Sequence, residues 1–221
     1  SADVAASAGS WAGRDRKAPP AASADHPVAM LRARFPDALV AGCSTAGEIL
    51  GDTVSDGSIA ALAITFADTR VRAEAITVTA ATESFAAAAE LGRRLAAPDL
   101  RHVLVLSDGL IVNGTALAQG FASVLAETVS VTGGLAGDGA AFRRTLVGLG
   151  TEILPNRIVA LGFYGQNLRV SYGSAGGWSA FGPRRLVTKS AGNVLYTVDG
   201  QPALTLYKRY LGERASGLPA T

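Results

Sequence analysis

Three short loops in the sequence carry the residue types that could bind a small polar molecule. Each loop directly follows a short apolar run with the character of a β-strand, and the loops cover residues 43–48, 107–113 and 133–139. The candidate ligand-binding residues in them are Cys43, Ser44, Thr45, Gly47, Glu48, Ser107, Asp108, Gly109, Asn113, Gly133, Gly134, Gly137 and Asp138. Hydroxyls, carboxylates, an amide and a closely approaching glycine backbone together suit a small polar or zwitterionic ligand.

A shared sheet edge would bring these three loops together. In an open α/β sheet, ligands bind beyond the carboxyl ends of the parallel strands. If the three preceding strands run parallel, their loops meet at one rim around a cleft. The alternative is that the glycines only permit tight turns and the carboxylates only cap helices. The sequence leaves both interpretations open.

Catalysis and metal binding have less support. A nucleophilic Cys43, the single cysteine, would need a nearby base, most often a histidine. His102 begins the strand whose far end carries the second loop, and His26 borders the N-terminal segment, so a small buried thiol is favoured. Asp108 and Asp138 could hold a cation such as Mg²⁺, but two carboxylates at unknown separation indicate little. We therefore expect no catalytic residue, no metal and no cofactor.

Composition limits the class of protein. Of 221 residues, 48% are hydrophobic and 17% are charged, which is enough apolar material for a core and too little charge for a disordered chain. The net charge of +2 comes without a dense basic stripe, so nucleic acid is not an expected partner. No apolar run reaches the roughly 18 residues of a membrane span, and no secretory signal is visible. We expect a cytoplasmic protein, and the alanine-rich, lysine-poor composition suggests a bacterial one.

The elements that would position the loops predict an α/β fold of mixed β-sheets with flanking helices. Helices are expected at residues 26–35, 82–96, 114–126 and 201–211. Residues 58–66 and 70–78 are expected to pair as antiparallel neighbours. Residues 101–106 are expected to form a central, fully buried strand. Further strands are expected at 38–42, 128–132, 185–190 and 194–198, with a meander over 145–150, 157–164 and 168–173.

An internal repeat supports this organisation. The matching segments are Ile59–Leu62 with Ile158–Leu161, Arg70–Val71 with Arg169–Val170, Val40–Gly42 with Val131–Gly133, and Ala46–Glu48 with Ala136–Asp138. Each unit is a helix, a strand, a Gly-rich loop that ends in a carboxylate, and a hairpin; chance similarity of short apolar strands is the alternative. The second unit begins with a strand, whereas residues 1–25 lack apolar periodicity. We expect residues 1–25 to be a disordered tail or linker and the first strand to be missing.

Several motifs in a fixed order resemble a known family. They are residues 42–49, 107–110, 113–114 and 133–139 with Phe142 and Thr145, followed by residues 177–178, 187–188, 199–204, Tyr207 and 210–212. Together they resemble the N-terminal half of a FIST domain, a sensory module of bacterial signal-transduction proteins that also occurs in some eukaryotic F-box proteins. The resemblance covers residues 26–212 and leaves 213–221 as a C-terminal tail, where the family's C-terminal half would begin.

The resemblance implies a non-enzymatic domain that senses a small ligand, with amino acids proposed as ligands and a signalling protein or domain as the output partner. The family's opening strand and its C-terminal half are both expected to be absent, and a site between the halves would leave this chain unable to bind alone. One alternative is an enzyme that uses Cys43 or Asp108. Another is a scaffold that docks a protein partner. The sequence specifies neither the ligand, nor the output partner, nor the oligomeric state.

Overall fold

The chain folds into helices and mixed β-sheets, which confirms the predicted α/β class. The computed structural model describes residues 4–10, 27–173, 176, 179–180, 182–192 and 194–218. It divides into two compact units, Ser1–Tyr172 and Gly173–Thr221, each described by itself below. The elements of the first unit are β1 (Val4–Ser10), α1 (Pro27–Arg34), β2 (Ala41–Cys43), β3 (Glu48–Leu50), β4 (Thr53–Ser55), β5 (Ser58–Ile64), β6 (Arg70–Thr77), a 3₁₀ turn (Ala81–Glu83), α2 (Ser84–Leu95), β7 (Leu100–Ser107), α3 (Gly114–Ala122), β8 (Ser130–Leu135), β9 (Val147–Leu149), β10 (Glu152–Leu154) and β11 (Arg157–Tyr164).

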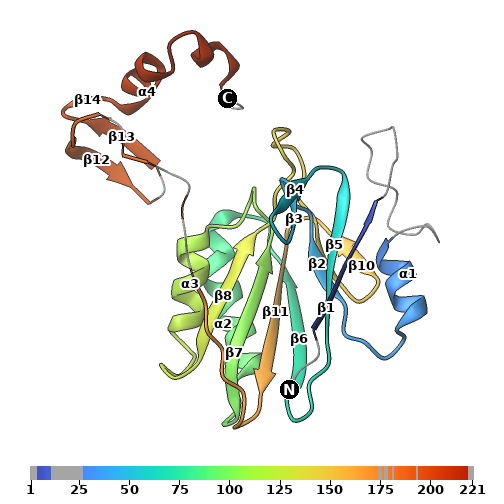
Figure 1. Cartoon of the computed structure of the whole chain (residues 1–221). Helices are drawn as coiled ribbons and strands as arrows, with labels where there is room; N and C mark the ends of the chain where they lie inside the picture. The colour runs from blue at the N-terminus through green and yellow to red at the C-terminus, as the bar shows by residue number, and fades with distance from the viewer. Residues whose placement is uncertain are drawn as a thin grey trace. The chain divides into compact units, whose positions relative to one another are not determined.

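A four-stranded mixed sheet forms the centre of the first unit (Figure 1). Its order is β6-β11-β7-β8, in which β11 is antiparallel to β6 and β7, and β7 is parallel to β8. The apolar run of β7 is therefore central, as predicted. Its burial alternates, because Val103 and Val105 are fully buried whereas Leu104 is half-buried. The expectation of complete burial was wrong for the face that carries Leu104.

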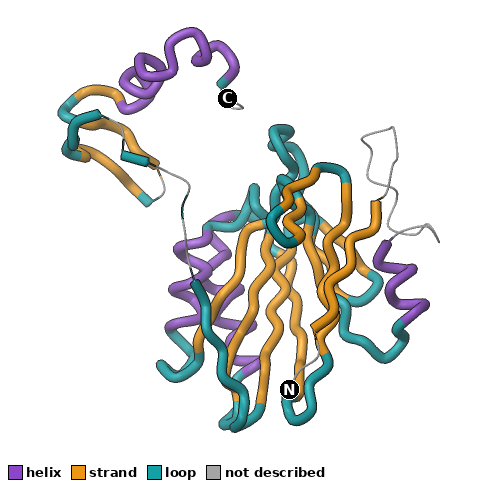
Figure 2. Tube along the Cα trace, viewed as in Figure 1, coloured by secondary structure: helices purple, strands orange, loops and turns teal. Residues whose placement is uncertain are grey.

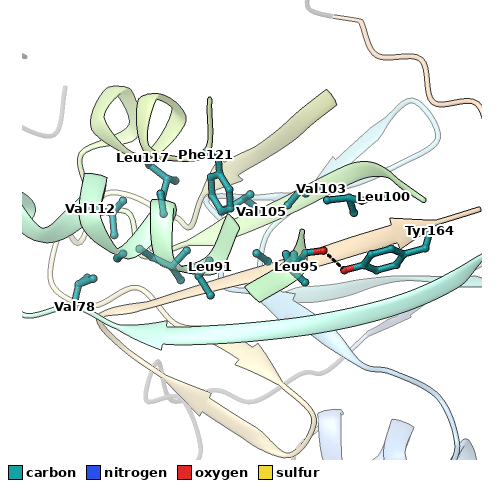
Figure 3. Close-up of a cluster of buried hydrophobic side chains, with 14 residues drawn as sticks. Val78, Leu91, Leu95, Leu100, Val103, Val105, Val112, Leu117, Phe121 and Tyr164 are labelled. Carbon is teal, nitrogen blue, oxygen red and sulfur yellow. Dashed lines mark hydrogen bonds between the residues drawn. The ribbon is translucent and has the colours of Figure 1, made fainter. Parts of the chain in front are cut away.

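Helices α2 and α3 cover one face of this sheet (Figure 2). Leu91 and Leu95 lie four residues apart on α2, so both point toward the sheet, and Phe121 of α3 packs beside them (Figure 3). At the far end, the Tyr164 hydroxyl donates a hydrogen bond of 2.7 Å to the Leu95 carbonyl oxygen. This bond satisfies a carbonyl at the last turn of α2 and ties the helix to β11.

A second sheet covers the opposite face. Its order is β10-β9-β2, and all neighbours are antiparallel. Val147 of β9 packs with Val159 and Leu161 of β11, and with Ala41 and Cys43 of β2. Small residues on β2 let the two sheets approach closely. The first unit is thus built as helices, four-stranded sheet and three-stranded sheet, and the candidate loops leave from β2, β7 and β8.

Two expectations about strand pairing were wrong. Residues 70–78 do form a strand, but β6 pairs with β11 instead of with β5. Residues 168–173 are not a strand, so the expected meander does not form. Adjacent apolar runs predict a hairpin only when the chain turns back directly, and here the segment between β5 and β6 carries the chain across to another strand.

The N-terminal segment contains a strand that the sequence did not predict. β1 pairs antiparallel with β5, in a register that runs from Val4 opposite Ile64 to Ser10 opposite Ser58. Residues 4–10 are therefore not a disordered tail, and the first strand is not missing. Apart from Val4 these residues are alanines, serines and a glycine, which lack the β-branched and aromatic character by which strands are recognised. The rest of the expected tail, residues 1–3 and 11–25, lies outside the described part of the chain.

The repeat is visible in the elements. The hairpin β3–β4 corresponds to β9–β10, and β5 corresponds to β11, all at the same spacing along the chain. β1 pairs with β5 as β7 pairs with β11. Because the two sequence repeats contain the same elements in the same order, a duplication is favoured over a chance similarity between short apolar runs.

The second unit is a small β-sheet followed by a helix. It contains β12 (Val187–Ala191), β13 (Val194–Val198), β14 (Gln201–Pro202), α4 (Ala203–Leu211) and a 3₁₀ helix (Gly212–Gly217), and the strand order is β12-β13-β14. An ion pair of 2.9 Å joins Arg185 to Asp199. Among its described residues, Val198 is the one buried side chain. Residues 177–178, which contributed to the family resemblance, lie outside the described residues.

Candidate functional site

The three candidate loops meet at one end of the four-stranded sheet, as predicted, but the cleft described below is lined by the first loop and not by the other two. The amide of Gly137 donates a hydrogen bond of 3.0 Å to the Ser44 carbonyl oxygen, which joins the third loop to the first. A Cβ atom at Gly109 would overlap the carbonyl oxygen of Ala136, so the second loop lies directly against the third. The route to this arrangement differs from the expected one, because β2 is paired antiparallel with β9 and is not a parallel neighbour of β7.

A fourth segment, residues 145–146, fastens the loops together. Ser44 donates its amide to the Leu146 carbonyl oxygen at 2.9 Å, and its hydroxyl accepts a hydrogen bond from the Leu146 amide at 3.0 Å. The Gly109 amide donates to the Thr145 hydroxyl at 3.0 Å. These bonds hold the loops in one geometry, which is a requirement for a preformed binding site.

Asp108 is used by the fold itself. Its side chain is almost fully buried, and its carboxylate accepts hydrogen bonds from the amides of Leu110, Ile111 and Asn156 at 2.8, 2.9 and 3.0 Å. Burial alone would raise the pKa of this carboxyl, but the hydrogen bonds from Thr145 and the three amides outweigh burial and lower it. Asp108 is thus an ionised anchor between its own loop and the start of β11.

Asp138 closes its own loop. Its carboxylate accepts hydrogen bonds from the amides of Phe142, Arg143 and Arg144, and the bond from Arg144 contributes most to lowering its pKa. The residue is partly buried. Three backbone donors on one carboxylate stabilise the loop after β8, and Asp138 is not in the lining of the cleft described below.

The remaining residues of the second and third loops also have local roles. Asn113 caps α3, because its side chain accepts a hydrogen bond of 2.9 Å from the Ala116 amide. Gly133 lies so close to β7 that a Cβ atom would overlap the Val105 carbonyl oxygen, whereas a Cβ at Gly134 would meet nothing within 4 Å. The buried Ser107 hydroxyl has no hydrogen-bond partner among the described residues.

A cleft of about 370 Å³ lies beside the first loop. Its lining contains every candidate residue of that loop and none from the other two: Cys43, Ser44, Thr45, Gly47, Glu48, Ile49, Ser58, Ile59 and Ala60. Ile49 and the first three residues of β5 were not among the predicted site residues. The repeat could have indicated β5, because Asp108 binds the start of the corresponding strand β11.

Glu48 gives this cleft a negative charge. Its carboxylate accepts hydrogen bonds from the Thr45 hydroxyl at 2.6 Å, the Ser58 hydroxyl at 2.9 Å and the Ser58 amide at 3.2 Å. The bond from Thr45 is the main cause of its lowered pKa, so the carboxyl is ionised at neutral pH. Ile49, Ile59 and Ala60 contribute the apolar part of the cleft lining.

Comparison with known protein families shows which family the chain belongs to. Residues 18–201 match the sequence model of the FIST N domain. The chain belongs to the FIST N domain family. FIST domains are sensory domains of signal transduction, which agrees with the resemblance seen in the motifs. No curated protein and no solved structure matches the chain.

Cys43 is the remaining reactive group of the cleft in this FIST N domain. Burial raises the pKa of its thiol, so the protonated form, which is the weaker nucleophile, dominates at neutral pH. The cleft lining contains neither a histidine nor a lysine that could activate it. Within the described ranges, three or more metal-ligating side chains do not come together, and no helix has the length and apolar stretch needed to cross a membrane.

Proposed function

We propose that this FIST N domain is a non-enzymatic sensor whose cleft binds a small ligand with an amino group, and that free amino acids are the ligand class. The observation that carries this is an ionised carboxylate, Glu48, in a preformed cleft with apolar walls. A ligand ammonium group would form a charge-assisted hydrogen bond to this carboxylate. Ile49 and Ile59 would contact an apolar part of the ligand.

The polar groups of the first loop fit the other end of an amino acid. The Ser44 hydroxyl oxygen accepts a hydrogen bond from Leu146, which leaves its proton to donate. A ligand carboxylate in the cleft could accept this proton in a hydrogen bond. Ligand-binding roles for the second and third loops, which include Asp108 and Asp138, have no such support, since neither carboxylate lines the cleft that contains Glu48.

Signalling would follow from differential binding. The cleft lies between the first loop and the start of β5, so a bound ligand favours the arrangement in which these two elements are close. A signalling output protein or domain then responds to that arrangement. The bacterial cytoplasm is the place we propose for it, because the resemblance to bacterial sensory modules carries that implication.

An enzymatic role fits this site less well. Cys43 has a raised pKa and no base in the cleft lining, and Asp108 is buried with its oxygens occupied. Neither residue is prepared to attack or to transfer a proton to a substrate.

Thermal unfolding of the full chain tests the proposed ligand class. Each free amino acid would be compared with its N-acetyl derivative, which keeps the side chain and the carboxylate but loses the ammonium charge. We expect at least one amino acid to raise the melting temperature and its N-acetyl derivative to leave it unchanged. An equal rise with both compounds, or no rise across the whole panel, contradicts the proposed recognition.

A further inference from the structure

We propose that the outer edge of β5 takes residues Leu168–Tyr172 as an additional strand, antiparallel to β5. This pairing does not depend on the ligand cleft and concerns the opposite end of β5. Of the strands that the structure describes, β5 pairs with β1 alone, so its other edge carries unpaired backbone groups. Leu62 and Ile64 are 59% and 44% exposed on this strand. An exposed apolar edge strand of this kind recruits a partner strand.

The repeat identifies that partner. β6 follows β5 along the chain but crosses over to pair with β11, the strand that corresponds to β5 in the second sequence repeat. The segment that follows β11 corresponds to β6, since Arg169–Val170 repeats Arg70–Val71. If the last strand of each sequence repeat pairs with the long strand of the other repeat, residues 168–172 cross back and pair with β5. The two repeats then exchange their last strands.

The two crossing segments already lie side by side. Phe66, Asp68 and Thr69, which lead from β5 to β6, line one shallow cleft of about 360 Å³ together with Asn167 and Arg169. A Cβ atom at Gly165 would lie 2.9 Å from the Asp68 carbonyl oxygen, so the backbones nearly touch. Residues 168–172 therefore begin next to the end of β5 and need no long loop to reach its edge.

The register implied by the repeat matches apolar side chains with each other. Phe163 lies opposite Val71, and Leu161 lies opposite Ala73, in the pair of β11 with β6. The corresponding pairs are Ile64 with Val170 and Leu62 with Tyr172. Residues directly opposite in an antiparallel pair lie on the same face, so these four side chains would form one apolar group.

Exposure supports this register independently of the repeat. Val170 and Tyr172 are 38% and 75% exposed, in a segment without regular secondary structure. A shift by one residue would place Ser171 and Arg169 opposite the two large side chains of β5 and would leave the apolar ones on the other face.

Engineered disulfides test both the pairing and the register. In the full chain with Cys43→Ala, the pair Ala63→Cys and Ser171→Cys corresponds to Gly162 opposite Arg72 and would lie directly across the two strands. The matched control is Ala63→Cys with Val170→Cys, whose side chains would point to opposite faces and cannot reach disulfide geometry. After mild oxidation we expect an intramolecular disulfide in the first variant, identified by mass spectrometry of peptides, and free thiols in the control.

Several results would overturn the pairing. Equal crosslinking of both variants would show a mobile segment without register. No crosslinking in either would show that the strand does not form, and disulfide-linked dimers would show that the edge of β5 pairs with a second copy.

Hydrogen exchange of the unmodified chain provides a check that needs no cysteine. We expect the amides of residues 169–172 and those amides of residues 60–64 that point away from β1 to be protected together, and Val170→Pro to abolish the protection of both sets; unchanged protection of these β5 amides contradicts the proposal.

Discussion

Two carboxylates hold the starts of the two repeated long strands, and they differ in what else they can do. Asp108 accepts a hydrogen bond from the amide just before β11, and Glu48 accepts one from the first amide of β5. Asp108 is buried among its donors, whereas Glu48 lines a cleft. The fold therefore needs both residues, but only Glu48 is placed to meet a ligand.

Replacing Asp108 with Asn is expected to lower the free energy of unfolding by about 1–3 kcal/mol at neutral pH, because an amide NH₂ group would face a backbone donor in a buried site. Its lowered pKa in the folded state means that Asp108 stabilises the protein above the unfolded pKa, about 3.9, and that this contribution is lost as pH falls through the folded pKa. Urea unfolding at neutral and acidic pH measures both effects. Asp138→Asn is the comparison: its carboxylate also accepts hydrogen bonds from three backbone amides but is only partly buried, so we expect a smaller loss, and an Asp108→Asn protein as stable as wild type would contradict the anchoring role.

Gly109 is expected to tolerate no side chain. A Cβ atom at this position would overlap the Ala136 carbonyl oxygen, so Gly109→Ala must separate the second and third loops. We expect a loss of roughly 1–3 kcal/mol in unfolding free energy, typical of overpacking. Gly134→Ala is the matched control, since nothing lies within 4 Å of its Cβ position. Equal stability of the two variants, measured by chemical denaturation, would mean that the loops do not touch at Gly109.

The sequence predicted the site in part. Hydroxyls, carboxylates and glycines after short apolar strands were enough to predict that three loops converge. Which carboxylate lines a cleft was not predictable, because the sequence does not show that Asp108 is buried among three backbone amides whereas Glu48 accepts a bond from one backbone amide and lies beside a cleft. The cleft walls contributed by Ile49 and Ile59 were missed for the same reason, since only the folded chain brings β5 to the first loop.

At the scale of elements, β7 carries the core on both of its faces. Val105 is buried against α2 and α3, and a charge there would have no partner. We expect Val105→Asp to abolish cooperative folding, observed as loss of the thermal transition. Val131→Asp on the edge strand β8 is the control, because Val131 is partly exposed and its carboxylate could reach water. A cooperatively folded Val105→Asp protein would contradict the central position of β7.

Strand existence was easier to predict than strand pairing. The runs of β5, β7 and β11 were identified because each is a continuous apolar stretch of strand length. Their partners were not, because pairing depends on contacts between residues far apart in sequence: β6 joins β11 and β1 joins β5. β1 itself was missed, since its small residues provide no apolar alternation and Val4 is its one β-branched side chain.

At the scale of the whole molecule, burial predicts how stability is distributed. β11 and β7 are enclosed by helices on one face and a sheet on the other, whereas β12 is exposed along its full length. Amide hydrogen exchange of the full chain should therefore be slowest in β7 and β11 and much faster in β12 and β13. Protection of β12 equal to that of β7 would contradict this distribution and indicate that the second unit is covered.

The central claim is that the cleft beside the first loop senses a ligand through the charge of Glu48. The most direct test is calorimetric titration of the full chain and two variants with the amino acid that raises the melting temperature most. We expect Glu48→Gln to weaken binding by about 10-fold or more, as loss of a hydrogen bond to a charged group does. Asp138→Asn, which removes a loop carboxylate outside the cleft, should bind as wild type does. Wild-type affinity in Glu48→Gln, or an equal loss in both variants, would contradict the account.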